Sequence, residues 1–371
     1  MKARLMVADS ERDADMLYAT GIIVPDPFIY FELCGKKYLV MSDLEFDRAK
    51  KHAKVDRVLS YERYRKQLKR AGAKEPRLSD VLNHVLRDYR IRVVQVPMHF
   101  PVGLAKRLRG VRVRVGTDPF FPERERKKLH EIRALSDALH MAEIGMGAAI
   151  KALRRSRIGR DGNLYWHDRK LTAEHVQGLI NATIAGLGGT ASHTIVACGN
   201  QACDPHESGH GPLKAHWPII IDIFPRDNTT GYWGDITRTV VRGRACEKVR
   251  QMYAVVGQAQ ALAFEKMRAG VNGKDIHEAI QSLFKRQGFN TGRRKARMQG
   301  FFHGTGHGLG LEIHERPRVS AADATLKAGH VVTVEPGLYY WGIGGVRLED
   351  VGVIQERRAR NLTRFPKILE V

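Results

Sequence analysis

The sequence HGTGHGLGLEIHE, residues 303–315, places three histidines among four glycines. Imidazole is a common metal ligand and acid–base group, and glycine lets a backbone come close to a ligand. The same stretch is also compatible with a glycine-rich loop whose histidines are incidental. Other candidate ligand residues elsewhere in the sequence are needed to choose between these two interpretations.

Four carboxylates stand in strand-like runs, where an unpaired charge is costly. Asp222 follows three isoleucines and Asp235 precedes ITRTVV, both within PIIIDIFPRDNTTGYWGDITRTVVRG (218–243). Glu335 ends the apolar run of VVTVEPGLYY (331–340), and Glu349 lies with Asp350 in GGVRLEDVGVI (344–354). A buried carboxylate has to be paired, hydrogen-bonded or bound to a metal.

For any one of these acids, the simplest explanation is a salt bridge to a nearby arginine such as Arg238 or Arg347. Four acids together with His307 favour a shared metal centre instead. Carboxylates and imidazole suit Mn, Co, Fe or Zn. Two bridging carboxylates can hold two divalent ions about 3.5–4 Å apart, which is the arrangement used for metal-assisted hydrolysis.

The order Asp, Asp, His, Glu, Glu, in the contexts GYWGDITRT, HGTGHGLGLEIHE, VTVEPGLYY and GVRLED, resembles the pita-bread metallopeptidases. This family includes Xaa-Pro dipeptidase (prolidase), Xaa-Pro aminopeptidase, methionine aminopeptidase and metal-free creatinase. The resemblance is strong from about residue 126 onward and weaker before. It implies an α/β (α+β) chain with a small N-terminal α/β domain at 1–122 and a pita-bread catalytic domain at 123–371.

The resemblance also implies roles for individual residues. Two divalent ions per subunit, Mn before Co, Zn or Fe, are expected on Asp222, Asp235, His307, Glu335 and Glu349. Asp235 and Glu349 match the bridging pair, and Asp222 matches a ligand of one ion only. The catalytic residues are expected to be His206, His314 and Glu335, with His206 or Glu335 carrying a proton to the leaving nitrogen. His303 and Arg347 match substrate-binding residues, and that arginine can also pair with a ligand carboxylate.

The implied activity is dinuclear metal-dependent hydrolysis of the peptide bond before proline in Xaa-Pro dipeptides. Three alternatives stay open: an Xaa-Pro aminopeptidase acting on longer peptides, another hydrolase of the fold, and a non-catalytic binding protein of the fold. The complete ligand set disfavours creatinase chemistry and the non-catalytic alternative. A homodimer is expected from the resemblance.

The chain is strongly basic, with 62 Lys and Arg against 40 Asp and Glu and a net charge of +22. Neither the aromatic interleaving of a single-strand platform nor a zinc-finger pattern accompanies this charge, so nucleic acid is not expected as the main partner. No apolar run is long enough to span a membrane, and no signal peptide is indicated. Four cysteines in 371 residues fit a reduced, cytoplasmic setting.

Some positions depart from the family pattern. Phe224 stands two residues after Asp222, where glycine is usual. It either narrows the site or packs in the core, and we favour packing because most aromatic residues of strands belong to the core. The 13-residue step from Asp222 to Asp235 is about two longer than usual. Glu207 replaces the usual Tyr after His206, and Gly234 stands where Ser is common. These changes leave the ligands intact and affect the expected substrate preference.

Periodicity and capping residues predict the main elements. Two short strands are expected in 29–42 around a CGKK turn, and further strands in VVQVPMHF (93–100) and VRVRVG (111–116). A long helix is expected within 120–155 and another from Thr172 to about 186. Helices closed by glycine are expected at 246–269 and 273–287, and a loop at 157–170.

Overall fold

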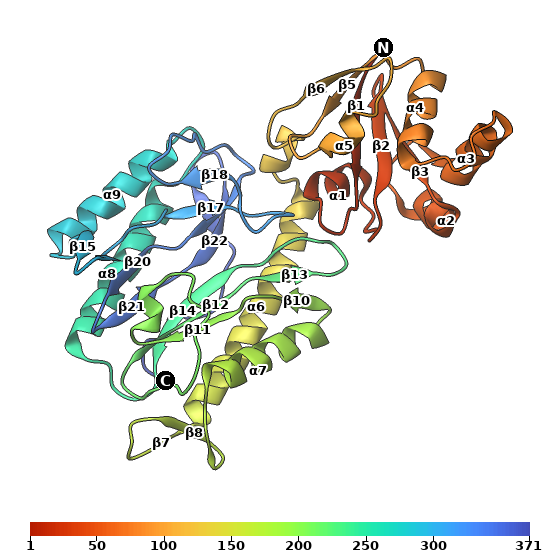
Figure 1. Cartoon of the computed structure of the whole chain (residues 1–371). Coiled ribbons are helices and arrows are strands. Elements are labelled where there is room, and N and C mark those ends of the chain that lie inside the picture. Colours follow the sequence, from red (N-terminus) through yellow and green to blue (C-terminus); the bar gives the residue numbers. More distant parts are fainter. The chain divides into compact units, whose positions relative to one another are not determined.

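A computed structural model describes residues 1–371, which divide into two compact units, Met1–Arg124 and Glu125–Val371 (Figure 1). The expected boundary after residue 122 lies two residues from this division, and its reading as a border between functional domains stays a prediction. No helix in the chain has both the length and the apolar character needed to cross a bilayer.

The first unit is built on a six-stranded sheet with strand order β4-β3-β2-β1-β5-β6. Its strands are β1 (Lys2–Ala8), β2 (Phe28–Leu33), β3 (Lys36–Met41), β4 (Arg57–Ser60), β5 (Val93–Val96) and β6 (Arg112–Val115). Its helices are α1 (Ala14–Thr20), α2 (Asp43–His52), α3 (Tyr61–Arg70), α4 (Leu78–Asp88) and α5 (Val102–Ala105). The strands expected in 29–42, 93–100 and 111–116 are therefore confirmed.

Both faces of this sheet are covered, because successive side chains of a strand point in opposite directions. Leu5 and Val7 of β1 pack with the apolar side of α4, which includes Val81 and Leu82. Met6, between them, packs in a separate cluster on the other face. The period-two pattern of one strand thus places a core on each side of the sheet.

Four helices frame the second unit: α6 (Leu129–Arg155), α7 (Ala173–Gly186), α8 (Glu247–Lys266) and α9 (Gly273–Arg286). Thr172 caps α7 as predicted, accepting a hydrogen bond from the His175 amide. The long helix of 120–155 begins only at Leu129, after a short 3-10 helix at Pro122–Glu125 (η1). The predicted closing glycine is confirmed for α9, where Gly288 follows the cap residue Gln287 in the left-handed conformation (φ 79°). It is wrong for α8, whose cap residue is Met267 and whose next glycine, Gly270, lies three residues further on.

The strands of the second unit form several small sheets between these helices. They are β7 (Arg157–Ile158), β8 (Leu164–Trp166), β9 (Arg169–Lys170), β10 (Gly189–Ala191), β11 (Ile195–Cys198), β12 (Pro218–Ile223), β13 (Pro225–Asp227), β14 (Ile236–Val241), β15 (Gly292–Arg294), β16 (Arg297–Gln299), β17 (Gly306–Gly308), β18 (Glu315–Val319), β19 (Val331–Val334), β20 (Gly337–Tyr340), β21 (Gly344–Arg347), β22 (Asp350–Ile354) and β23 (Ala359–Asn361). A short 3-10 helix, η2 (Gln201–Cys203), follows β11. The segment 157–170 was predicted as a loop and instead folds into the three-stranded β7-β8-β9 sheet.

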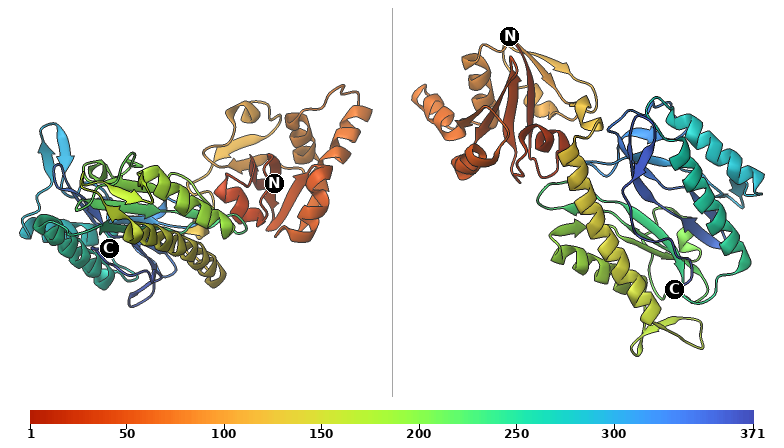
Figure 2. Two further views of the ribbon diagram at one scale, coloured as in Figure 1. Left: turned by 90° about the horizontal axis from the view of Figure 1, so that it is seen from below. Right: turned by 180° about the vertical axis from the view of Figure 1, so that it is seen from behind.

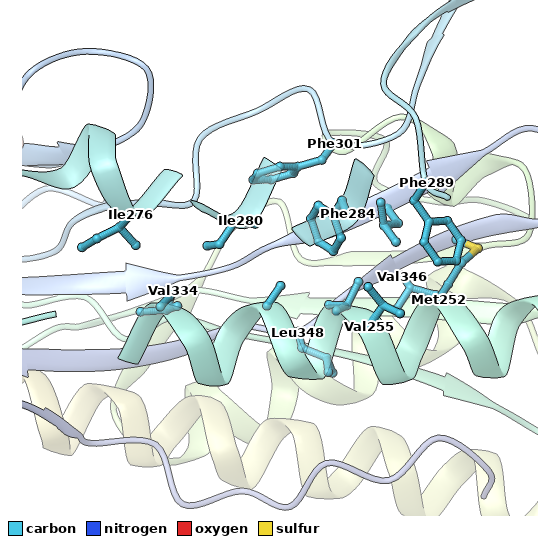
Figure 3. Close-up of a cluster of buried hydrophobic side chains, with 14 of the residues drawn as sticks. Met252, Val255, Ile276, Ile280, Phe284, Phe289, Phe301, Val334, Val346 and Leu348 are labelled. Carbon is cyan, nitrogen blue, oxygen red and sulfur yellow. The ribbon is translucent and has the colours of Figure 1, made fainter. Parts of the chain in front are cut away.

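Two sheets carry the residues of interest, β11-β12-β14 and β18-β17-β19-β22-β23. Helices α6 and α7 pack on each other and on the β10–β14 region, whereas α8 and α9 pack on each other and on the later strands (Figures 1 and 2). Figure 3 shows the core beneath α8 and α9, in which Met252 and Ile280 meet Val334 and Leu348. This apolar layer supports the strands whose ends bear Glu335 and Glu349.

The last residues of the chain run beside β14. The Val241 amide donates to the Leu369 carbonyl, and the Val371 amide donates to the Val241 carbonyl. Arg238 of the same strand donates to the carbonyls of Phe365 and Pro366. Residues 365–371 are thereby fixed along the outer side of β14.

Candidate metal centre

Strand pairing brings the first two carboxylates to one face of the β11-β12-β14 sheet. Asp222 on β12 lies opposite Thr237 on β14 in the antiparallel register. Asp235 precedes Thr237 by two residues, so its side chain points to the same face. Both carboxylates are buried, with exposed fractions of 9% for Asp222 and 4% for Asp235. The longer connection between them forms β13 and a tight turn, and the register of Asp222 is intact.

His307 lies on β17, and the glycines beside it serve strand packing. A Cβ on Gly306 would lie 1.9 Å from the Thr333 carbonyl oxygen, and one on Gly308 would lie 2.3 Å from that of Arg316. Glycine is therefore needed where neighbouring strands press against β17. We expected these glycines to let a ligand approach the backbone. Instead, the atoms that lie close to them are backbone atoms of neighbouring strands.

Glu335 and Glu349 lie in the short links that follow β19 and β21. Glu349 was expected inside a strand and instead falls between β21 and β22. Its amide donates to the Thr237 carbonyl, and the Thr237 hydroxyl donates to its carboxylate at 2.7 Å. These two bonds join the link after β21 to β14 and hold Glu349 near Asp235.

The side chains converge on a single small volume. Ligand atoms of Asp235, His307 and Glu349 all lie within 4.8 Å of one another. The Nε2 atom of His307 is 3.5 Å from Glu335 Oε1 and 3.8 Å from Asp235 Oδ2. The other ring nitrogen, Nδ1, lies 3.1 Å from the Gly308 carbonyl, so Nδ1 carries the proton and Nε2 faces the acids as an acceptor.

Salt bridges explain only part of this set of acids. Arg347 pairs with Asp222, Nη2 to Oδ2 at 2.6 Å, whereas Arg238 pairs with Asp350 at 2.9 Å. No Lys or Arg lies in salt-bridge range of the three remaining carboxylates, which are Asp235, Glu335 and Glu349. The salt-bridge explanation therefore accounts for Asp222 and leaves three acids without a cation, of which Asp235 and Glu349 are buried and Glu335 is partly buried.

The pKa values of these side chains are shifted because they are buried with no protein cation among them. Burial, followed by repulsion from Glu349, raises the pKa of Asp235 well above its usual range. Burial, followed by repulsion from Glu335, does the same to the pKa of Glu349. Burial raises the pKa of Glu335 to about 7 and lowers the pKa of His307 to about 3. The protein alone thus favours neutral imidazole and protonated carboxyls at this position.

These features fit divalent cations. The cluster offers carboxylate oxygens and one neutral imidazole nitrogen, which is the donor set that Mn, Co, Fe and Zn accept. The buried Asp222 Oδ1 has no hydrogen-bond partner in the protein, so this oxygen is available to bind a metal ion. Positive charge placed here would also remove the repulsion that raises the carboxyl pKa values.

A series of hydrogen bonds through Tyr339 and His303 holds the guanidinium of Arg347 in place. Its Nη1 donates to the Tyr339 hydroxyl at 3.0 Å, and that hydroxyl donates to His303 Nε2 at 2.9 Å. His303 Nδ1 in turn donates to the Gly304 carbonyl at 2.8 Å. Both ring nitrogens of His303 are therefore occupied. The substrate contact expected of this histidine stays a prediction, and a hydrogen bond to substrate would require one of these bonds to break.

The cluster opens into a cavity of about 840 Å³ within the second unit. His206 and His314 line it, and neither ring makes a hydrogen bond in the protein. The ring of His314 stands edge-on to that of His307, with centroids 4.4 Å apart. His193, for which no role was predicted, also lines the cavity.

Arg318 was not singled out from the sequence. It lies opposite His307 in the β17–β18 register and lines the same cavity. Its exposed guanidinium makes no ion pair or hydrogen bond with protein groups, unlike the buried Arg347. The only sequence signal was its place in the HERPR segment after His314.

The unusual residues have structural explanations. Phe224 lines the cavity and is partly exposed, so the expected core position was wrong, because β12 ends at Ile223 and the next side chain faces the opening. A Cβ on Gly234 would lie 2.4 Å from the Ala138 carbonyl oxygen of α6, which excludes larger residues beside Asp235. Glu207 accepts from the Gly209 amide and pairs with His210.

Comparison with known proteins identifies the class of protein that this fold and site define. The model of metallopeptidase family M24 matches residues 133–356. The chain therefore belongs to metallopeptidase family M24, and the resemblance seen in its motifs is confirmed at this level.

The chain is similar to particular relatives. It is 33% identical over 245 residues to the Xaa-Pro dipeptidase of Pyrococcus furiosus, which covers 66% of this chain and 64% of that protein. It is 41% identical over 185 residues to the uncharacterized peptidase YqhT of Bacillus subtilis, covering half of each chain. The matches thus span less than two thirds of these relatives.

Solved structures share the fold over nearly the whole chain. The X-Pro aminopeptidase from Thermotoga maritima has a TM-score of 0.83 at 23% identity and covers 100% of this chain and 98% of its own. Prolidase from Pyrococcus furiosus has a TM-score of 0.78 at 24% identity and covers 98% of this chain and 97% of its own. The predicted α/β chain with a pita-bread domain is confirmed.

Proposed function

We propose that the protein hydrolyses the peptide bond before proline and prefers Xaa-Pro dipeptides. One observation carries the proposal: Asp235, Glu335 and Glu349 converge on neutral His307 without a protein cation, at one end of a cavity of substrate size. The similarity to the Pyrococcus Xaa-Pro dipeptidase supports the choice of substrate class.

Two divalent ions, manganese first among the candidates, are proposed to be held by Asp222, Asp235, His307, Glu335 and Glu349. When bound, such ions lower the pKa of a water molecule and polarise a scissile carbonyl. Asp235 and Glu349 match the bridging pair of the family and have ligand atoms within 4.8 Å of each other, so they are the proposed shared ligands. Arg347 orients Asp222 through its 2.6 Å bond and leaves Oδ1 of that carboxylate available.

Side chains along the cavity wall are proposed to stabilise the carbonyl oxygen, donate the proton and contact the proline ring. The ring of His314, which has no protein partner, is proposed to hold the carbonyl oxygen as charge develops on it. His206 is the proposed donor of a proton to the departing nitrogen, with Glu335 as the second candidate. The prolyl nitrogen carries no N–H, so recognition depends on ring contacts, for which Phe302 and Ile313 in the wall are suitable.

Arg318 is proposed to pair with the free C-terminal carboxylate of a dipeptide. It lines the cavity and has no carboxylate partner of its own, whereas Arg347 is already occupied by Asp222. A charge-assisted pair contributes about 1.5–3 kcal/mol, which corresponds to roughly 10- to 150-fold in kcat/KM. Such a difference is sufficient to separate dipeptides from longer peptides.

The deciding experiment compares kcat/KM for an Xaa-Pro dipeptide, its C-terminal amide and the same peptide extended by one residue. Metal content of the protein is measured in parallel. A loss of tenfold or more with the amide and the extended peptide is expected. Equal or faster cleavage of the extended peptide would instead identify an Xaa-Pro aminopeptidase, and cleavage of non-proline peptides alone would refute the proline assignment.

Two further expectations accompany this proposal. The protein is proposed to act as a homodimer, by resemblance to the family, and sedimentation at two protein concentrations tests this directly. A cytoplasmic location is proposed from the reduced cysteines, none of which forms a disulfide. Fractionation of the producing cells tests that location.

A further inference from the structure

The positive charge of the chain is concentrated in one stretch of the first unit. Residues 63–114 contain fifteen Lys and Arg against three acids, Glu75, Asp80 and Asp88, so this stretch alone carries 15 − 3 = +12 of the total +22. Neither the fold nor the proposed peptidase activity uses this charge.

Part of this charge surrounds a cavity of about 560 Å³. Four exposed arginines line it, three from residues 87–92 and one from the loop before β6, and Asp80 is the only acid among the lining residues. These arginines are Arg87, Arg90, Arg92 and Arg109. None of the four forms a salt bridge, whereas Arg124 and Arg48 of the same unit pair with Asp15 and Glu45.

The end of α4 explains only two of these arginines. Cations are favoured near a helix C-terminus, where carbonyl groups carry partial negative charge, and this accounts for Arg87 and Arg90. Arg92 precedes β5 and Arg109 lies in the loop before β6, so neither gains from that dipole. Asp80 balances only one of these four like charges, and an anion in the cavity would reduce the repulsion among the others.

The loop that supplies Arg109 is fixed in place. The Asn83 side chain of α4 donates to the Arg107 carbonyl at 2.9 Å and accepts from the Arg109 amide at 2.8 Å. Leu68, Leu86, Ile91 and Val111 add apolar surface to the same cavity. Its volume falls in the range of about 300–1,000 Å³ that small-molecule sites occupy.

We propose that this cavity of the first unit binds a small molecule that carries two or more phosphate groups, such as a nucleoside di- or triphosphate. Guanidinium groups match phosphate oxygens in charge and bidentate geometry. The apolar surface suits the non-phosphate part of such a molecule. This proposal concerns the first unit alone and stands independently of the peptidase proposal.

The test is calorimetric titration of the intact protein with ATP, pyrophosphate, AMP, adenosine and a single-stranded oligonucleotide, at about 50 and about 300 mM salt. ATP and pyrophosphate are expected to bind at low salt and to weaken at high salt, AMP to bind less tightly, and adenosine not to bind. The double variant Arg92→Gln/Arg109→Gln is expected to weaken ATP binding about tenfold or more.

A matched control removes the same charge from the same unit away from the cavity. Lys36→Gln/Lys51→Gln changes two exposed lysines and is expected to alter ATP binding by less than about twofold. The single variant Arg92→Gln serves if the double variant does not fold, as judged by circular dichroism. The proposal is overturned if wild type binds no phosphate probe at low salt, if adenosine binds as tightly as ATP, if both double variants lose affinity equally, or if only the oligonucleotide binds.

Discussion

The guanidinium of Arg347 lies 2.6 Å from the carboxylate of Asp222, with both side chains buried in the second unit. This pair neutralises one of four clustered carboxylates. It also engages the arginine that the sequence suggested for substrate binding. The other three acids have no lysine or arginine in salt-bridge range, and Arg318 in the same cavity has no carboxylate partner.

The central carboxylate is tested by Asp235→Asn, which keeps the side-chain shape and removes its charge. We expect activity to fall by at least about 1,000-fold and the bound metal to decrease, since a shared ligand positions both ions. The metal-free variant should be as stable as metal-free wild type or more stable, because burial raises the pKa of Asp235 and the wild-type carboxyl must take up a proton on folding, whereas asparagine is already neutral. Metal analysis and thermal unfolding measure these outcomes.

Asp227→Asn provides the matched control for that variant. Asp227 is also buried in the connection between β12 and β14, but its carboxylate accepts from the Thr229 and Thr230 amides. This variant should lose stability and retain metal and activity. Full activity in Asp235→Asn, or metal loss in both variants, would contradict the proposed centre.

The stability of metal-free protein should fall as pH rises from about 5 to 8. Glu335 has a folded-state pKa of about 7, above its usual 4.5, so the folded state binds more protons than the unfolded state in this range. An acid with a raised pKa contributes stability at low pH that is lost as pH rises through the folded value. The loss is on the order of 3 kcal/mol for this group. Denaturant unfolding with a chelator present measures it.

Saturating manganese provides the comparison for that titration. Bound cations stabilise the ionised carboxylates, so the decline toward pH 8 should disappear or reverse. An identical pH dependence with and without metal would show that Glu335 and its neighbours do not bind the ion.

Arg318→Gln should reduce kcat/KM for an Xaa-Pro dipeptide by roughly 10- to 150-fold, because the charge-assisted pair with the substrate carboxylate is lost. The C-terminal amide of the same peptide should be affected little. Arg316→Gln is the control, since Arg316 is also exposed on β18 but does not line the cavity. Equal losses on the acid and the amide would remove Arg318 from substrate recognition.

Tyr339→Phe interrupts the bonds from Arg347 to His303. His303 Nε2 then lacks its partner and Arg347 Nη1 keeps only a 3.4 Å bond to the Pro205 carbonyl, so we expect the unfolding free energy to drop by about 1–3 kcal/mol. Metal content should stay near that of wild type, since Tyr339 contacts no proposed ligand except through Arg347. A reduced kcat with unchanged metal would mark Tyr339 as a positioning residue. A kcat equal to that of wild type would limit it to a structural role.

Phe224→Gly restores the residue usual for the family at this position. Phe224 lines the cavity, so its removal should widen the site and raise kcat/KM for extended peptides relative to dipeptides. The ratio of the two kcat/KM values is the measurement. An unchanged ratio would show that the phenyl ring does not limit peptide length.

Local patterns were sufficient for much of the fold. The alternation in 29–42 predicted two strands, and Thr172 predicted the start of α7, because each depends on neighbouring residues. The sheet at 157–170 was missed, since its strands are two or three residues long and too short to show periodicity. Phe224 was misplaced because the end of a strand, rather than its pattern, decides where that side chain points.

Two site residues that the sequence missed are recognised by side-chain bonds between different elements. Thr237 bonds to Glu349 across 112 positions, and Tyr339 bonds to His303 across 36 positions and to Arg347 across the β20–β21 hairpin. No local spacing encodes such contacts. The order of acids around His307 was informative because it resembles a family, and their roles as ligands remain a proposal that the convergence of side chains supports.

The covering of β14 by residues 365–371 bears on solubility. β14 is the outermost strand of its sheet, and such a strand offers unpaired amides and carbonyls to other chains. The Glu349 amide occupies the Thr237 carbonyl, and the Leu369 and Val371 backbones occupy Val241. Removing the final seven residues would expose part of this apolar edge and favour self-association through β pairing, so fusion tags are better placed at the other end of the chain.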